Sequence, residues 1–451
     1  MEKREKISKS FEDGNEEEWG SIFRLGVSPV KANFRIGPLR SHLYNYVYAS
    51  NEKLKNKDSR VYFRVDDSNQ EKGDREMSEK LFYFFSETLG MEFDQQEDNS
   101  QMIFQSERVD LYREYLEKLF DVGVVFLDKE SGLTLFDIEK FIDIYGETIQ
   151  FHDVVRGQVV LKLKKLLDKQ KFFPLVRSNG SVLYHLASVA DDHLLGVTHV
   201  VRGADKLSVA QYQEMVRIAL DLEPKKFMHT PLMLDDEGGL LKGDVLYDSF
   251  IKKGILPQAM LSYMISSGYG DPDMIYDSIE AIVEDFDYKK VRQNNGKFDF
   301  KKLVSVNRKI LSSVSDEDYS ISLRLYSAKI NREDMHYDLN NEIELAPLFS
   351  KLKIPFEKTE VFYDTLDRPD YSGIKTLDIE TRNELDLLIE EFKLDSFDYK
   401  DYFYSSNKNK IRALKFFLIG DLQVSGGLVE ITEYLISKNL ISKRLEMLSG
   451  L

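Results

Sequence analysis

The sequence predicts a multidomain protein in which an α/β fold is followed by all-helical segments. Strand patterns, alternating or β-branched, are interleaved with amphipathic helical patterns in the first half of the chain, and Lys/Glu-rich helical patterns fill it from about residue 321. A chain of 451 residues with 42% hydrophobic residues can hold several domains with sizeable cores.

The first predicted strand covers 21–27 and leads into a helix that opens at Gly37 and Pro38. A strand, a glycine turn and a helix N-terminus favour bound phosphate, because unpaired backbone N–H groups and the helix dipole attract anions. Ser106 is expected to cap the N-terminus of a later helix. Further predicted elements are a strand over 61–69 and amphipathic helices over 80–89 and 111–122.

The stretch 183–207 carries the most informative pattern in the chain. An apolar helical face runs into the acidic pair Asp191 and Asp192, and a β-branched strand over 197–201 ends at Arg202. Ligands of open α/β sheets gather at the carboxyl ends of the strands, so Arg202 lies where it would bind a substrate carboxylate. A surface ion pair after a core strand explains the same pattern.

The composition excludes several classes of protein. Zero cysteines exclude disulfides, thiolate nucleophiles and cysteine-bound zinc, and we expect neither structural zinc nor any metal held by the protein itself. The net charge of −16 argues against a generally basic surface, although a local basic groove remains compatible with it. We find no apolar run of membrane-spanning length and no secretory signal. We therefore expect a cytoplasmic protein with a disordered tail over 1–20.

The segment YHLA…DDHLLGVTHVVRG resembles the second-half signature of glutamyl-tRNA synthetases, a class I aminoacyl-tRNA synthetase family. Other blocks also resemble the family and occur in the family's order over nearly all of the chain after residue 20. They include VYFRVDDSN, FQSER, VVRGQV and ILPQAML. The resemblance implies a split Rossmann-like catalytic domain with an acceptor-binding insertion, then helical stem-contact and anticodon-binding domains. The implied ranges are 21–106 and 181–245 for the two halves of the nucleotide-binding fold, 107–180 for the insertion, 246–320 for the stem-contact domain and 321–451 for the anticodon-binding domain.

The resemblance also implies a glutamate site. Its substrate-binding residues would be Arg24, Ser28, Asp66, Tyr184, Ser188 and Arg202. An arginine that grips the carboxylate with two hydrogen bonds would explain a preference for glutamate over glutamine, because the wrong side chain would leave buried charge unpaired. For Asp66, a simple acidic turn after a strand remains an alternative.

Both ATP signatures depart from the family pattern. Arg35 stands where the first signature has its histidine, and Leu240 stands where the second has its first lysine. Loss of one preorganised cation typically costs about 3 kcal/mol of transition-state stabilisation. The implied catalytic residues are Arg35, Gly37 and Lys242, and Asp205 joins them as an ATP contact.

Basic residues of two segments would contact tRNA phosphates. They are Arg156, in the range 107–180, and Lys289, Lys290 and Arg292 in the helical part. The range 107–180 also contains a predicted hairpin turn at Asn179 and Gly180. Arg156 could instead be a basic residue on a strand edge that discourages aggregation, and the lysine cluster could be a solvated helix face.

Three functions remain open at this point. The first is a monomeric ligase that activates glutamate with MgATP and transfers it to the 3′ end of tRNA, without contact to a membrane. The second is a catalytically impaired paralogue that binds an amino acid or tRNA as a regulatory module, which the substitutions at Arg35, Asp66, Ala204 and Leu240 favour. The third is an unrelated ATP-binding scaffold.

Overall fold

The computed structural model describes most of the chain. The described residues are 20–30, 34–68, 75–96, 99–241, 246–315, 317, 319, 323, 369, 371, 374, 376–393, 408–419 and 428–449. The predicted tail over 1–20 lies outside them except for its last residue, as do Lys242 and much of 321–451. The chain divides into two compact units, Met1–Tyr247 with Pro257–Val306 and Asp248–Leu256 with Asn307–Leu451.

Parallel sheets form the centre of the first unit. One has the order β1-β2-β3, and the other has the order β7-β6-β10-β9 with only β7 antiparallel. The strands are β1 (Ile22–Val27), β2 (Arg60–Val65), β3 (Met102–Phe104), β6 (Thr148–Asp153), β7 (Gly157–Lys162), β9 (His199–Gly203) and β10 (Lys226–Thr230). The predicted α/β fold is therefore confirmed, and β6 shows that part of the range 107–180 extends the second sheet.

The two sheets meet along β1 and β9. The backbone N–H of Thr198 donates to the carbonyl oxygen of Ile22 at 2.9 Å. Beyond this contact, the side-chain amide of Asn45 donates to the carbonyl oxygens of Arg24 at 2.9 Å and Val201 at 3.4 Å. Buried carbonyl groups need donors, so Asn45 holds the two strands together where their own pairing stops.

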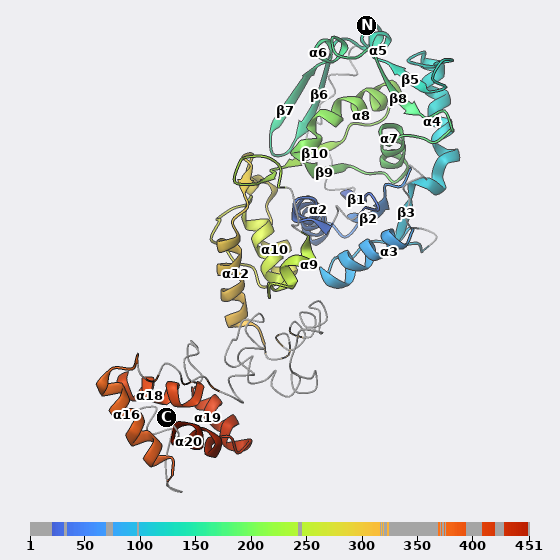
Figure 1. Ribbon diagram of the computed structural model, residues 1–451. Helices are drawn as coiled ribbons and strands as arrows, with labels where there is room; N and C mark the ends of the chain where they lie inside the picture. Colours follow the sequence, from blue (N-terminus) through green and yellow to red (C-terminus); the bar gives the residue numbers. More distant parts are fainter. Residues whose placement is uncertain are drawn as a thin grey trace. The chain divides into compact units, whose positions relative to one another are not determined.

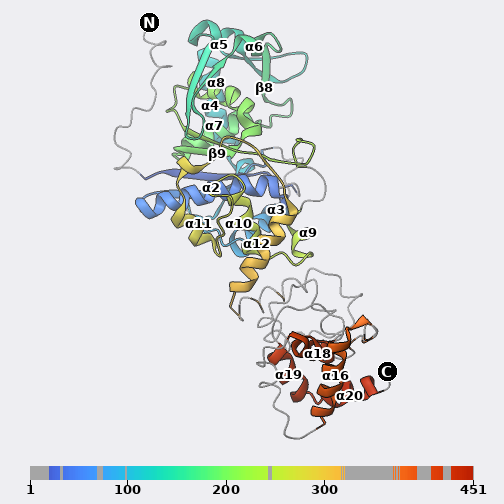
Figure 2. The same cartoon turned by 90° about the vertical axis from the view of Figure 1, so that its left-hand side faces the viewer.

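Helices α2 (Ile36–Lys55) and α7 (Tyr184–Leu194) lie on opposite faces of the β1 sheet (Figures 1 and 2). Alternation along β1 explains this: the ring of Phe23 packs on Tyr48 of α2, while Arg24 reaches Asp192 of α7. Helix α2 begins at Ile36, one residue before the predicted start at Gly37, and its first turn holds Pro38, where a missing N–H costs little.

The next predicted helices are largely confirmed, with one correction. Helix α3 (Arg75–Tyr83) continues as a π-helical turn (Phe84–Thr88), and α4 (Val109–Val122) begins two residues earlier than predicted. Ser106 does not cap α4, whose N-cap residue is Arg108 without a side-chain cap. The Ser106 hydroxyl instead donates to Asp67 at 2.6 Å, and the same carboxylate accepts its backbone N–H at 2.9 Å.

An antiparallel sheet of order β4-β5-β8 packs with α4 and α7 around one hydrophobic core. Its elements and their neighbours are β4 (Val125–Leu127), β5 (Thr134–Asp137), α5 (Ile138–Tyr145), α6 (Lys164–Leu167), β8 (Phe172–Val176) and α8 (Leu207–Ala219). The predicted turn at Asn179 and Gly180 is confirmed: Gly180 has φ +85°, and the turn closes with a bridge between Val176 and Val182.

The remaining elements are mostly helical, in agreement with the predicted helical region. They are β11 (Met233–Leu234), α9 (Tyr247–Ile251), α10 (Pro257–Ser266), α11 (Ile279–Asp285), β12 (Gly296–Lys297) and α12 (Phe300–Ser313), then α16 (Ile379–Glu391), α18 (Lys408–Ile419), α19 (Leu428–Ser437) and α20 (Ile441–Ser449). In the second unit, Arg444 is fully buried and donates to the carbonyl oxygen of Leu418 at 2.8 Å. Among the described residues, no helix has the length and apolarity needed to cross a membrane.

A buried histidine in β9 predicts a loss of stability in acid. His199 is 5% exposed, stacks on Phe23 at 4.7 Å, and burial lowers its pKa from 6.5 to about 3. Because the folded pKa lies below the unfolded one, the unfolded chain binds more protons, and stability falls as the pH drops below 6.5. From pH 7.5 to pH 5, His199 should cost about 2 kcal/mol of unfolding free energy.

Urea unfolding of the wild type and of His199→Phe at both pH values measures this effect. The phenylalanine keeps the stacking on Phe23 but cannot take up a proton, so the variant should lose about 2 kcal/mol less than the wild type. Equal losses in the two proteins would contradict the role of His199.

Candidate functional site

A cavity of about 650 Å³ opens where β1 and β9 end and α2 begins. The predicted residues that line it are Arg24, Ser28, Arg35, Gly37, Asp66, Tyr184, Arg202 and Asp205. The structure thus brings Arg24 of β1 together with Tyr184 of α7 and Arg202 of β9, which lie about 160 to 180 positions later in the sequence. This position at the carboxyl ends of parallel strands is where α/β folds bind ligands.

Arg202 is 8% exposed at the end of β9, and its guanidinium is held by neutral groups. Its Nε donates to Nε2 of His229 at 3.2 Å, and its Nη1 donates to Oε1 of Gln213 at 2.6 Å. The buried Nη2 has no hydrogen-bond partner, and within the described part of the chain no carboxylate forms an ion pair with Arg202. A surface ion pair is therefore the wrong interpretation of this arginine.

Asp153 and His229 form a hydrogen-bonded chain that ends at Arg202. Both are fully buried, and Nδ1 of His229 lies 2.6 Å from Oδ2 of Asp153. The same carboxylate accepts the backbone N–H groups of Val155 and Arg156, each at 2.9 Å. Burial raises the pKa of Asp153, but the hydrogen bond from His229 and these backbone donors outweigh it and lower the pKa below its usual value. Asp153 is therefore ionised and fixes the imidazole ring.

A network of buried ions lies on the α7 side of the cavity. Asp192 accepts from Nε of Arg24 at 3.0 Å and from Nη1 of Arg64 at 2.7 Å. Arg64 also donates from Nε to Asp66 at 2.7 Å and from Nη2 to the hydroxyl of Ser188 at 3.4 Å. Ser188 is fully buried and does not line the cavity, so any effect it has on a substrate passes through Arg64.

The charge on Asp192 is preserved by its partners. Burial raises the pKa of Asp192, but the guanidinium groups of Arg24 and Arg64 lower it further than burial raises it. Its neighbour Asp191 behaves differently, because burial raises the pKa of Asp191 more than Arg64 and Arg108 lower it. Two adjacent carboxylates on α7 thus differ in acidity because they have different partners.

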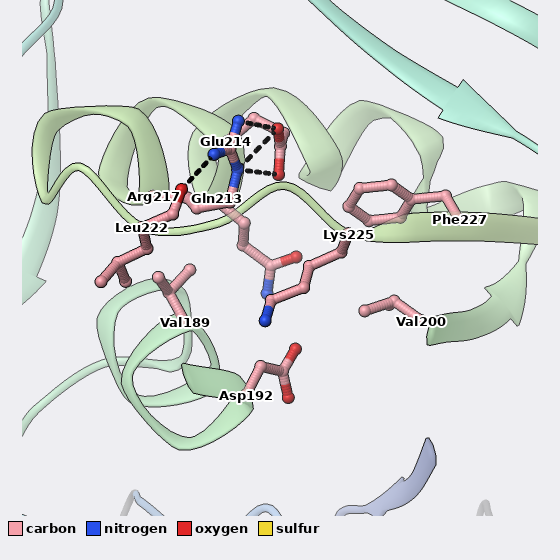
Figure 3. Close-up of a pocket in the computed structure, with 9 residues that line it drawn as sticks. All are labelled: Val189, Asp192, Val200, Gln213, Glu214, Arg217, Leu222, Lys225 and Phe227. Atoms are coloured by element: carbon pink, nitrogen blue, oxygen red, sulfur yellow. Dashed lines mark hydrogen bonds and ion pairs between the residues drawn. The ribbon is translucent and has the colours of Figure 1, made fainter. Parts of the chain in front are cut away.

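A second, much smaller cavity of about 20 Å³ lies beside Asp192 (Figure 3). It has room for about one water molecule. Lys225 points toward Asp192 across it, and burial lowers the pKa of this lysine despite the nearby carboxylate. On α8, the adjacent side chains Gln213 and Glu214 point to different sides, and Glu214 pairs with Arg217 at 2.9 Å.

The start of α2 also lines the large cavity. Arg35 is the exposed N-cap residue of this helix, and Gly37 lies in its first turn, where the backbone N–H groups have no intrahelical partner. Leu240 also lines this cavity, while Asp205 pairs with Lys206 at 3.5 Å on its rim. The helix N-terminus and Arg35 together can bind the phosphates of a nucleotide.

The predicted tRNA contacts lie outside the cavity. Arg156 is half-buried in the turn between β6 and β7, not in a strand, and its Nε is buried without a hydrogen-bond partner. Lys289, Lys290 and Arg292 are exposed, as predicted, but they lie in a 3₁₀ turn and the extended segment after it. For these three residues the interpretation as a helix face is therefore wrong, because α11 already ends at Asp285; Lys301 and Lys302 of the same basic cluster do lie on a helix, α12.

Four residues of the networks around the cavity were not identified from the sequence: Arg64, Asp153, Gln213 and His229. For Arg64 a signal exists, since it interrupts the apolar pattern of a strand, and a buried charge requires a partner. His229 similarly follows apolar residues in β10. Gln213 lies on an ordinary amphipathic helix, and nothing in the local pattern distinguishes it from a surface residue.

Comparisons with known proteins identify a family model and several relatives with similar sequences. The family model described as "tRNA synthetases class I (E and Q), catalytic domain" matches residues 32–137 and 140–305. Glutamate–tRNA ligase 1 of Petrotoga mobilis is 27% identical, over 94% of this chain and 96% of that protein. The glutamate–tRNA ligase of Clostridium tetani is 28% identical, over 78% of each.

A similar fold occurs in a crystal structure of a glutamate tRNA ligase from Elizabethkingia meningosepticum in complex with its amino acid. The TM-score is 0.70 at 18% sequence identity, and the similarity covers 95% of this chain and 99% of that chain. The family match spans more than half of the chain and includes Tyr184 and Arg202. This protein therefore belongs to the class I tRNA synthetases of the glutamate and glutamine (E and Q) family.

Proposed function

We propose that this protein is a glutamate–tRNA ligase, which activates glutamate with MgATP and transfers the glutamyl group to the 3′ end of tRNA. The observation that carries the proposal is the Arg202 guanidinium, which is buried at the cavity with an unpartnered Nη2. A buried positive charge without a carboxylate partner is costly, and an anionic substrate side chain would supply that partner.

In the proposed reaction, the α-carboxylate of glutamate attacks the α-phosphorus of ATP and releases pyrophosphate. The side-chain carboxylate would bind Arg202 with Tyr184 beside it, and Asp66 and Ser28, which line the same cavity, would contact the rest of the amino acid. Arg35, Gly37, Asp205 and Lys242 contact ATP, and Mg²⁺ is carried by the nucleotide. The protein contributes positioning and electrostatic stabilisation and no covalent intermediate. The terminal ribose hydroxyl of the tRNA then attacks the adenylate and releases AMP.

The tRNA would be bound by several parts of the chain. In this proposal, 107–180 holds the acceptor end, with Arg156 near it, 246–320 contacts the stem, and 321–451 reads the anticodon. Exposed Lys289, Lys290 and Arg292 would contact phosphates, and each such contact makes binding more salt-dependent. The protein would act as a cytoplasmic monomer.

Exchange of labelled pyrophosphate into ATP tests the activation step. We expect exchange that depends on glutamate, and the assay is run with and without tRNA because either condition can support it. Glutamine in place of glutamate is the matched control and should give no exchange. Absence of glutamate-dependent exchange under both conditions would contradict the ligase function.

One observation favours a second candidate, a catalytically impaired paralogue that binds glutamate or tRNA. Leu240, which replaces the first lysine of the second ATP signature, lines the cavity together with Leu241. An apolar side chain there gives no charge stabilisation to a transferring phosphate. Glutamate binding without pyrophosphate exchange would identify this function.

A further inference from the structure

The arginines around the site are held in two different ways. Buried Arg24 and Arg64 and half-buried Arg217 each pair with a carboxylate, at distances from 2.7 to 3.0 Å. Arg202 instead donates to the amide oxygen of Gln213 and to the imidazole of His229. Two adjacent residues of α8 show this contrast: Gln213 accepts from Arg202, while Glu214 forms an ion pair with Arg217.

The position of the proton on His229 follows from its partners. Nε of Arg202 can only donate, so Nε2 of His229 must accept, and the ring proton lies on Nδ1 facing Asp153. Burial lowers the pKa of His229, and the adjacent guanidinium of Arg202 acts in the same direction. The ring is therefore neutral near pH 7, and Asp153 holds it in the tautomer that can accept from Arg202.

We propose that Gln213 and His229, the latter oriented by Asp153, are positioning residues that hold the Arg202 guanidinium without neutralising it and thereby make the site select a carboxylate over an amide. This inference rests on the proposed function, because it concerns how the glutamate side chain is chosen. A carboxylate at position 213 would form an internal ion pair with Arg202, and a ligand carboxylate would then meet a pair with no net charge. Neutral acceptors fix the orientation of the guanidinium and leave its charge for the ligand.

The charged groups around Arg202 agree with this role. Burial lowers the pKa of Arg202, and the carboxylates of Asp192 and Glu214 oppose this effect, but each of them is already paired with another arginine. The Cζ of Arg202 also lies 5.3 Å from the centre of the Phe227 ring, a cation–π contact that stabilises the positive charge without neutralising it. A ligand carboxylate is then the partner that fits the unpartnered Nη2.

The decisive variant is Gln213→Glu, which changes charge with almost no change of shape. Calorimetric titration of the full chain with glutamate and with glutamine, in the presence and absence of tRNA, gives the ratio of the two affinities. We expect glutamate affinity to fall about tenfold or more and glutamine affinity to change by less than about threefold. If the ratio of glutamate affinity to glutamine affinity in this variant equalled that of the wild type, the inference would be overturned.

The matched control is Gln158→Glu, the same substitution at an exposed position of β7, which should leave both affinities unchanged. Gln213→Met removes the acceptor without adding charge and serves if Gln213→Glu does not fold. Its glutamate affinity should fall about tenfold or more, from the loss of one hydrogen bond to a charged group; an unchanged affinity would overturn the positioning role. A wild-type chain that binds no glutamate would contradict the proposed function itself, which separates the two failures.

Discussion

Replacing Arg202 with alanine is expected to reduce glutamate binding and glutamate-dependent pyrophosphate exchange by about 10²- to 10³-fold or more. The substitution removes a desolvated charge, and truncating one partner of a buried, hydrogen-bonded charge pair costs about 2–5 kcal/mol. Calorimetry measures the binding loss, and exchange kinetics at saturating ATP measure the effect on activation.

Two further variants sharpen this test. Arg202→Lys keeps the charge but loses the planar fork that donates to Gln213 and His229, so it should recover only part of the affinity. Arg113→Ala removes an exposed arginine of α4 and should change neither readout. If Arg202→Ala bound glutamate as tightly as the wild type, the carboxylate site would have to be placed elsewhere.

Asp192→Ala is expected to destabilise the first unit by about 3–5 kcal/mol. The carboxylate binds both Arg24 and Arg64, and its removal leaves two buried guanidinium groups without their shared partner. Breaking a buried ion pair on one side has this cost because the remaining charge stays desolvated. Urea unfolding, followed by fluorescence or circular dichroism, measures the change in unfolding free energy.

The exposed pair on α4 provides the control for Asp192. Asp110 is paired with Arg113, but its side chain is 91% exposed, and Asp110→Ala should change stability by less than about 1 kcal/mol. The pH dependence gives a second readout: since the pKa of Asp192 is lowered below 3.8, its contribution is present above about pH 4 and is lost as the pH falls through the folded pKa. An Asp192→Ala protein as stable as the Asp110→Ala protein would show that the two arginines find other partners.

Local patterns were sufficient for the elements that form the cavity. A strand over 21–27, a helix opening at Gly37 and a strand ending at Arg202 are each defined by periodicity and by turn or cap residues within a few positions. The prediction that Ser106 caps a helix failed because its side chain bonds a residue distant in sequence. Ser106 bonds Asp67 instead of capping α4, because the buried end of β2 offers a carboxylate that would otherwise lack donors.

By itself, the sequence placed Arg202 at the carboxyl end of a strand, because strand boundaries are local properties of the chain, and its resemblance to the synthetase family supplied Arg24 and Tyr184 as the other residues of the site. Only the tertiary structure decided which arginines are neutralised and which keeps its charge for a ligand. Asp192 pairs with Arg24 and Arg64 across 168 and 128 positions of sequence, while Gln213 and His229 leave Arg202 without an ion pair among the described residues. Such choices depend on the three-dimensional distance between side chains and on their shared burial, and no local pattern records either quantity.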